Sequence, residues 1–165
     1  MSQALAEARL TSAESRIDIL ASEARGSADD KSRIDRHVEA LRKAHASASA
    51  AARAAGSRFD DALEELGTRL AIAERRRAAE VADDRDDFVH AVEAELHAWD
   101  GYIELLEKRR AAGTTDVSTS ELRSRRNEAA KRLGDMRMTP GDTWRERREE
   151  VFQALDELDR EAGTA

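Results

Sequence analysis

The side chains best suited to metal chemistry lie between Asp87 and His97. Asp87 and His90 stand three residues apart, and Glu93 and His97 stand four apart, so each pair falls on one face of a helix. A di-iron or zinc site in a helical bundle needs matching pairs on facing helices, and no second segment of the chain supplies them. We therefore expect no metal site, and we expect the histidines to lie on solvated helix faces.

Three clusters of arginine have the chemistry to bind phosphate groups when they are gathered on one face. They are Arg75-Arg76-Arg77, Arg123 with Arg125-Arg126, and Arg145 with Arg147-Arg148. Acids stand beside them, for example Glu74 and Glu80 around the first cluster, which favours ion pairs within and between helices. Nucleic-acid association is therefore the least favoured of the functions considered.

The chain carries no motif that predicts catalysis or a cofactor. It has no Gly-rich phosphate loop, no Gly-x-Ser-x-Gly and no His-Glu-x-x-His. It also has no cysteine, which removes thiolate nucleophiles and thiolate metal ligands. We expect a non-enzymatic protein with no catalytic, cofactor-binding or metal-binding residues and no small-molecule ligand.

The elements that position these residues are predicted to be helices. No proline precedes Pro140, and 38% of the residues are charged while only 4% are aromatic. Such a composition is typical of long helices and coiled coils rather than of a thick globular core. The sequence predicts an elongated all-α fold with no β-sheet.

We predict a single helical domain over residues 1–165 with one very long helix and three shorter ones. The expected helices span 2–25, 28–111, 119–136 and 141–162. The long helix would measure about 120 Å at 1.5 Å per residue. Gly56-Ser57 is its possible break, because Gly56 has the chemistry of a helix C-cap and Ser57 with Asp60 has capping-box spacing; a hairpin there is the alternative.

The first half of the long helix has the a/d pattern of a coiled-coil seam, with apolar or small residues at alternating steps of three and four. We predict that this seam meets another helix, either of a second copy or of another protein. The proposed interface residues are Ile34, Val38, Leu41, Ala48, Ala52, Ala55, Phe59, Leu63, Leu66 and Leu70.

The second half of the chain carries larger apolar side chains at a period near 3.6, which predicts packing in a local helical bundle. These residues would anchor the bundle. The proposed anchors are Phe88, Val92, Leu96, Trp99, Ile103, Trp144, Val151, Phe152 and Leu155.

Trp99-Asp100-Gly101 has the form Trp-x-Gly. It resembles the turn that joins two helices in the Trp-x-Gly family of type VII secretion substrates. The resemblance covers only that turn, and no tyrosine follows Tyr102 to supply the export signal of that family. It implies a secreted effector as an alternative function.

The function most consistent with these patterns is that of a coiled-coil structural or adaptor protein, a scaffold that acts through helix–helix contacts and self-association into a homo-oligomer. A compact four-helix binding protein is the alternative. No signal-peptide pattern and no run of about 20 apolar residues occurs, which predicts a soluble cytoplasmic protein without a membrane span. Arginine far outnumbers lysine, which suggests a GC-rich bacterial source.

Overall fold

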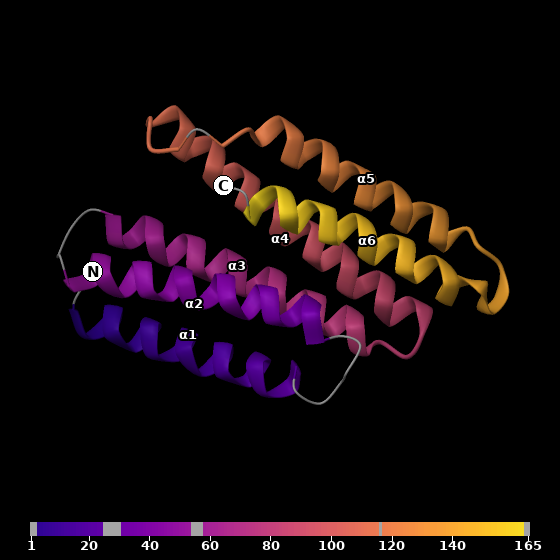
Figure 1. Cartoon of the computed structure of the whole chain (residues 1–165), viewed down its shortest axis with the longest axis horizontal. Helices are drawn as coiled ribbons and strands as arrows, with labels where there is room; N and C mark the ends of the chain where they lie inside the picture. Colours follow the sequence, from indigo (N-terminus) through magenta and orange to yellow (C-terminus); the bar gives the residue numbers. More distant parts are fainter. Residues whose placement is uncertain (1–2, 25–30, 54–57, 116, 164–165) are drawn as a thin grey trace. The chain divides into compact units, whose positions relative to one another are not determined.

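The computed structural model describes residues 3–24, 31–53, 58–115 and 117–163 (Figure 1). Every regular element in this part of the chain is helical, so the predicted all-α class is confirmed. The elements are α1 (Gln3–Ala24), α2 (Lys31–Arg53), α3 (Arg58–Val81), α4 (Arg85–Ala111), α5 (Thr119–Arg137), the 3-10 turn η1 (Gly141–Thr143) and α6 (Trp144–Gly163).

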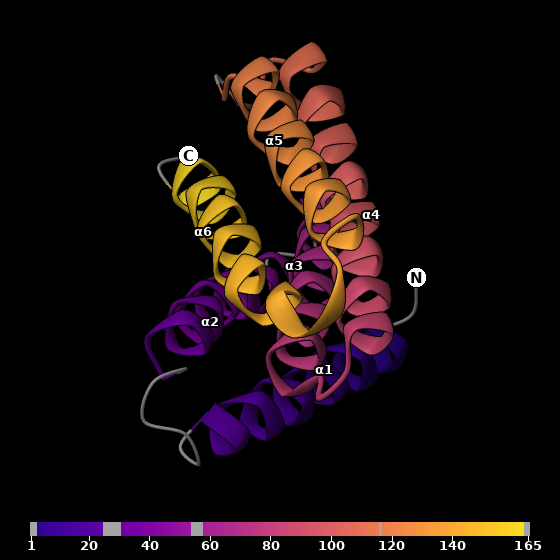
Figure 2. The ribbon, with the colours of Figure 1, turned by 90° about the vertical axis from the view of Figure 1, so that its right-hand side faces the viewer.

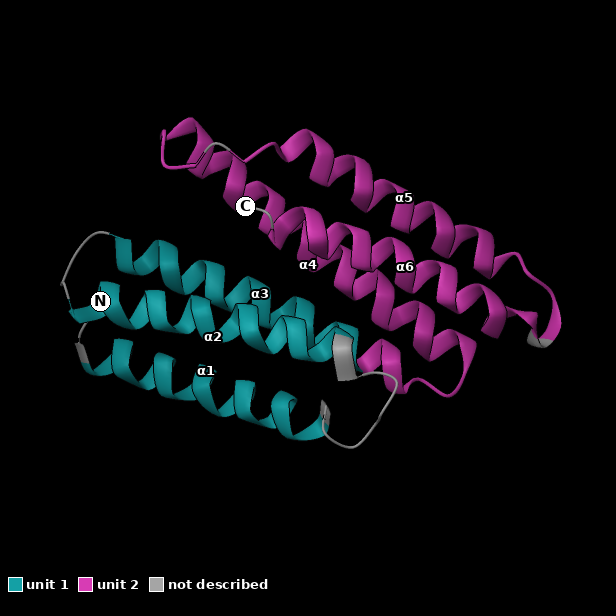
Figure 3. Cartoon of the chain, in the orientation of Figure 1, with its two compact units in different colours: residues 1–77 teal, residues 78–165 magenta. Residues whose placement is uncertain are grey.

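The chain divides into two compact units, residues 1–77 and residues 78–165 (Figure 3). Unit 1 holds α1, α2 and most of α3. Unit 2 holds the C-terminal end of α3 together with α4, α5 and α6. Each unit has a hydrophobic cluster of its own.

The predicted single helix over 28–111 is wrong, because this segment forms α2, α3 and α4. The expected break at Gly56-Ser57 lies outside the described residues. A further break follows Val81 and was not predicted. There Asp84 has extended backbone angles, φ −116° and ψ 166°, and its Oδ1 accepts a hydrogen bond from the backbone N–H of Asp87 at 2.8 Å. Asp84 is therefore the N-cap of α4.

The other side of this break is held by Arg148 of α6. Its guanidinium donates to the backbone oxygens of Ala79 at 2.8 Å and Ala82 at 3.1 Å, and also to that of Glu80. The last carbonyls of a helix have no partner within the helix, so Arg148 supplies the donors that α3 lacks. A contact that spans more than 60 residues of sequence has no local signature.

Unit 1 is built from three helices that reverse direction at each connection (Figure 1). Its core combines residues of all three: Ala13, Ile17, Leu20 and Ala21 of α1, Ile34, Val38, Leu41 and Ala48 of α2, and Leu66, Leu70 and Ala73 of α3. Ion pairs Arg16–Glu74 (2.6 Å) and Arg77–Glu23 (3.5 Å) join α1 to α3. The predicted coiled-coil packing is not seen among the described helices, since three helices share one core, and steps of three and four also suit the inner face of a bundle helix.

Small residues allow α1 and α2 to lie close together. Ala48 is fully buried, and Nε2 of His45 lies 3.2 Å from the backbone oxygen of Leu10 on α1. A side chain of one helix therefore reaches the backbone of its neighbour at this level of the bundle.

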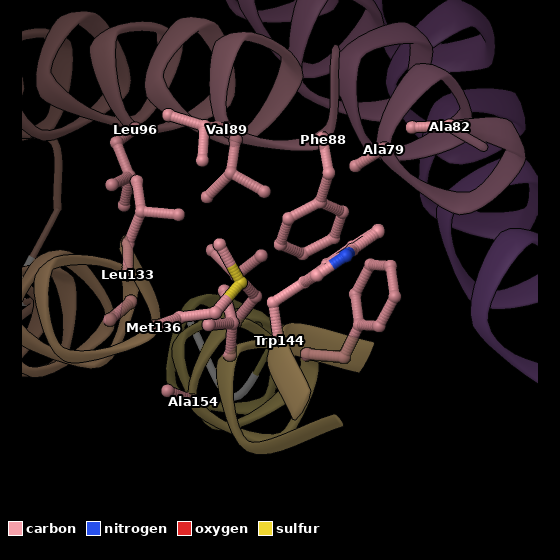
Figure 4. Packing of buried hydrophobic residues seen from close by; sticks show 14 residues of the cluster. Ala79, Ala82, Phe88, Val89, Leu96, Leu133, Met136, Trp144 and Ala154 are labelled. Carbon is pink, nitrogen blue, oxygen red and sulfur yellow. The ribbon is translucent and has the colours of Figure 1, made fainter. Parts of the chain in front are cut away.

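Unit 2 is packed with larger side chains. α5 lies beside both α4 and α6 (Figures 1 and 2). Phe88 of α4 stands 6.1 Å from Trp144 and 5.4 Å from Phe152 of α6, ring centre to ring centre, the second contact being edge-to-face. Leu133 and Met136 of α5 complete this part of the core (Figure 4). Such aromatic pairs stabilise a core beyond the area that they bury.

The connections of unit 2 show which sequence signals act as caps. Gly113 has φ 70°. Its backbone N–H donates to the backbone oxygen of Arg110 at 3.0 Å, and that of Thr114 donates to the backbone oxygen of Arg109 at 2.9 Å. These bonds end α4 near the predicted stop. Ser118 occupies the N-cap position of α5 but makes no side-chain cap hydrogen bond. Its hydroxyl lies 3.0 Å from that of Ser120 instead.

Replacement of Ala48 by leucine tests the packing of the unit 1 core. Ala48 is fully buried there, so we expect the larger side chain in A48L to lower the free energy of unfolding by about 1–3 kcal/mol. The matched control is A50L, because Ala50 is exposed on the same helix, and its effect should stay within about 0.5 kcal/mol. Urea denaturation followed by circular dichroism measures both, and equal effects would contradict the packing described.

Removal of the α4 cap should also destabilise the protein. We expect D84A to lower the free energy of unfolding by about 1 kcal/mol, because the backbone N–H of Asp87 loses its acceptor. Asp83 is exposed beside it and is not the cap, so D83A serves as the control. The same denaturation experiment would refute the role of Asp84 if the two variants were equally stable.

Candidate interaction surface

Most residues of the proposed interface lie inside unit 1. Ile34, Val38, Leu41, Ala48, Phe59, Leu66 and Leu70 are buried, Ala52 and Leu63 are partly buried, and Ala55 lies outside the described residues. Six of the seven buried residues, all but Phe59, belong to the core shared with α1. The helix that meets this seam in the structure is therefore α1 of the same chain.

All nine proposed bundle anchors are buried in unit 2. Seven of them belong to one cluster, namely Phe88, Val92, Leu96, Trp144, Val151, Phe152 and Leu155. The other two, Trp99 and Ile103, are buried on α4, and the Trp99 ring stands edge-to-face to that of Tyr102 at 5.7 Å. All nine side chains therefore pack inside unit 2.

Three arginines of α5 form ion pairs with acids on neighbouring helices. Two of these acids lie on α4 and one lies on α6. The pairs are Arg123 with Glu107 (2.9 Å), Arg126 with Asp100 (2.7 Å) and Arg125 with Glu157 (2.8 Å). A phosphate backbone would have to compete with these carboxylates for each guanidinium.

The remaining two clusters are also largely occupied. In the first, Arg76 is fully buried and Arg77 pairs with Glu23. In the last, Arg147 pairs with Glu150 at 3.2 Å, and Arg148 caps α3. Several arginines of these clusters are thus engaged in ion pairs, in burial or in capping within their own unit.

The pair of Arg123 and Glu107 shows the electrostatic consequence. Two hydrogen bonds of 2.9 Å from Arg123 hold the pKa of the Glu107 carboxyl below its ordinary value, and the Coulombic attraction acts in the same direction. The same contact raises the pKa of Arg123. Because the folded-state pKa of Glu107 is lowered, this contribution to stability is present above the unfolded-state pKa and is lost as the pH falls through the folded-state value.

The histidines and acids of α4 do not gather into a metal site. His90 and His97 are both exposed. Within the described part of the chain, no group of three metal-ligating side chains is placed to hold an ion.

A polar hollow of about 340 Å³ opens on unit 2 and is lined by Arg85, Asp86, Val89, His90 and Arg137. Both of its arginines already have partners. Arg85 donates to the backbone oxygen of Thr139 at 3.3 Å, and Arg137 pairs with Glu93 at 2.6 Å. The hollow therefore presents a mixture of opposite charges rather than a ready anion site.

The outer face of α1 carries a second stripe, which we call the outer stripe. Its members are Leu5, Ala8, Ser12, Ser15, Ile19 and Ser22, all exposed and separated by alternating steps of three and four. Leu5 is 48% exposed and Ile19 is 55% exposed, which is unusual for large aliphatic side chains in this structure. No charged residue interrupts the stripe over about 26 Å.

Two hydroxyls of the outer stripe are satisfied by their own helix. Ser15 donates to the backbone oxygen of Thr11 at 3.1 Å, and Ser22 donates to that of Ile19 at 2.8 Å. Burial of these serines would therefore leave no donor unpaired. The outer stripe is therefore a helix face of mostly small side chains with little polarity.

The sequence contains this stripe, but it also contains the competing stripe Leu10, Ala13, Ile17 and Leu20. Both stripes have helical spacing, but the stripe that begins at Leu10 is the more apolar one, which predicts that it faces inward. The structure places Ala13, Ile17 and Leu20 in the core and leaves the outer stripe exposed.

Trp99-Asp100-Gly101 lies in the middle of α4 and not in a turn. In the family that it resembles, this motif joins two helices, so the local structure differs from that of the motif. No protein-family model, curated protein or solved structure matches this chain. Among the described helices, none is both long and apolar enough to cross a membrane.

The pairing of Arg123 with Glu107 can be tested directly. We expect R123A to raise the pKa of Glu107 toward the ordinary glutamate value, because the hydrogen bonds that favour its charged form are lost. Nuclear magnetic resonance titration of the carboxyl carbon measures this pKa. R132A is the control, since Arg132 pairs with Glu128 and Glu150, and an unchanged Glu107 pKa in R123A would contradict the contact.

Proposed function

We propose that this protein is a non-enzymatic structural protein that acts through helix–helix contacts and associates with a second copy of itself along the outer stripe of α1. The observation that carries the proposal is the stripe itself. The stripe is an exposed helix face whose residues have the a/d spacing of helices that pack against one another, and none of its members is charged.

Most of the residues first predicted to recruit a partner are buried in unit 1, so they favour a partner surface elsewhere on the chain. The outer stripe has the spacing, the small residues and the exposed aliphatic side chains that such a surface needs. Alanine and serine in its middle allow two backbones to approach closely, while Leu5 and Ile19 supply apolar area near its ends.

A second copy is the occupant that this surface fits best. A charged partner would find no complementary charge within the stripe, whereas a small, uncharged face matches an identical face. Two copies related by a two-fold axis would each contribute the same patch. Burial of apolar area contributes about 25 cal/mol per Å², so the exposed portions of Leu5 and Ile19 on both copies would provide much of the gain.

The proposal predicts a native mass above the 18.3 kDa of one chain. Light scattering after size-exclusion chromatography should give a concentration-dependent mass that approaches two chains. I19E and S15E should return the mass to that of one chain, because each places a charge in the contact. Both positions are exposed in the single chain, so neither substitution should reduce the helical circular dichroism signal.

S47E is the matched control, because Ser47 is exposed on α2 and lies outside the stripe. It should associate like the unchanged protein. A mass of one chain at every concentration would refute self-association. An unchanged mass in both I19E and S15E would show that the copies meet at another surface.

A further inference from the structure

The link between α3 and α4 consists of Ala82, Asp83 and Asp84, and it contains neither glycine nor proline. Nothing in the covalent structure of these residues prevents a helix from continuing through them. The sequence itself predicts continuity here. The break must therefore be imposed by contacts.

One contact is local and the other comes from a distant helix. The Asp84 side chain caps the first turn of α4. Arg148, from α6, takes the backbone oxygens of Ala79, Glu80 and Ala82. Its guanidinium also lies over the rings of Phe88 and Phe152, 5.1 and 5.3 Å from their centres, which fixes its position.

Arg148 occupies the acceptors that a continuous helix would use. In an α-helix, each backbone N–H donates to the oxygen four residues earlier. The amides of Asp83, Asp84 and Asp86 would therefore donate to Ala79, Glu80 and Ala82. These are the three oxygens that Arg148 binds. With the arginine in place they are satisfied without a continuous helix, and without it the backbone N–H groups of a continuous helix can supply the missing donors.

Other features of the junction also favour the broken state. Ala79 and Ala82 are buried in the core of unit 2. The four aspartates of the link and of the first α4 turn act in the same direction, because acids are stabilised at a helix N-terminus and repel one another within a helix. Arg148 acts together with these features.

We infer that the α3–α4 junction is a two-state hinge latched by Arg148: with the guanidinium in place the break persists, and when it leaves, residues 78–111 of unit 2 join into one helix. The position of α6 then decides the state of the junction. This inference does not rest on the outer stripe or on self-association.

Distance measurement by pulsed electron paramagnetic resonance tests the hinge. The chain has no cysteine, so A78C and H97C introduce the only two labelling sites, both exposed and both in unit 2. A continuous helix would separate these positions by about 28 Å. We expect a single shorter distance with Arg148 present and a new population near that value in R148M.

Two variants sharpen the measurement. R147M removes a neighbouring arginine that pairs with Glu150, and it should leave the distance unchanged. R85P should restore the short distance in R148M. Proline suits the first position of α4, and the extended backbone of Asp84 suits the residue before proline, whereas proline inside a continuous helix breaks it.

The inference is overturned if R148M keeps the distance distribution of the unchanged protein, or if its long-distance population persists in the R85P background. Should R148M lose its helical circular dichroism signal, R148K replaces it in the same experiment. A lysine ammonium cannot reproduce the planar fork over three oxygens. We expect a smaller population near 28 Å in R148K, and an unchanged distribution there would refute the latch.

Discussion

The placement of the Arg148 guanidinium is the constraint on which the organisation of unit 2 depends. This one group contacts the end of α3 through hydrogen bonds, and the core of α4 and α6 through the rings of Phe88 and Phe152. A guanidinium can do both because its edge carries the donors while its face stacks on aromatic rings. It therefore links the point where α3 ends to the core that holds α4 and α6 together.

The cores of the two units are built from different kinds of side chain. Unit 1 brings helices close with small and aliphatic residues such as Ala48 and Ile34, and it adds ion pairs between α1 and α3. Unit 2 relies on large aromatic side chains, and arginines of α5 form ion pairs with acids of both neighbouring helices. Part of the charge of this chain therefore joins helices within each unit.

Several features of the fold were predictable because their physical cause is local. Helix formation follows from composition and spacing, and the stop near Gly113 follows from the freedom of glycine at positive φ. The break at Asp84 also has a local signal, since Asp84 and Asp87 have N-cap spacing, but the surrounding acids are equally typical of a solvated helix face. The capping bond and the distant arginine together decide between these readings. The face of α1 that packs inward was also predictable, because the stripe that begins at Leu10 is more apolar than the outer stripe.

The sequence by itself determined that this protein is helical, that its two halves pack differently, and that the nine aromatic and aliphatic anchors of the second half would be buried. Helical periodicity and side-chain size are properties of neighbouring residues, so they can be read without the fold. Only the tertiary structure decided where the long helical segment breaks and which helix covers the seam from Ile34 to Leu70. Those outcomes depend on contacts between residues that are far apart in the chain, and a periodic pattern is satisfied equally well by a partner from the same molecule or from another.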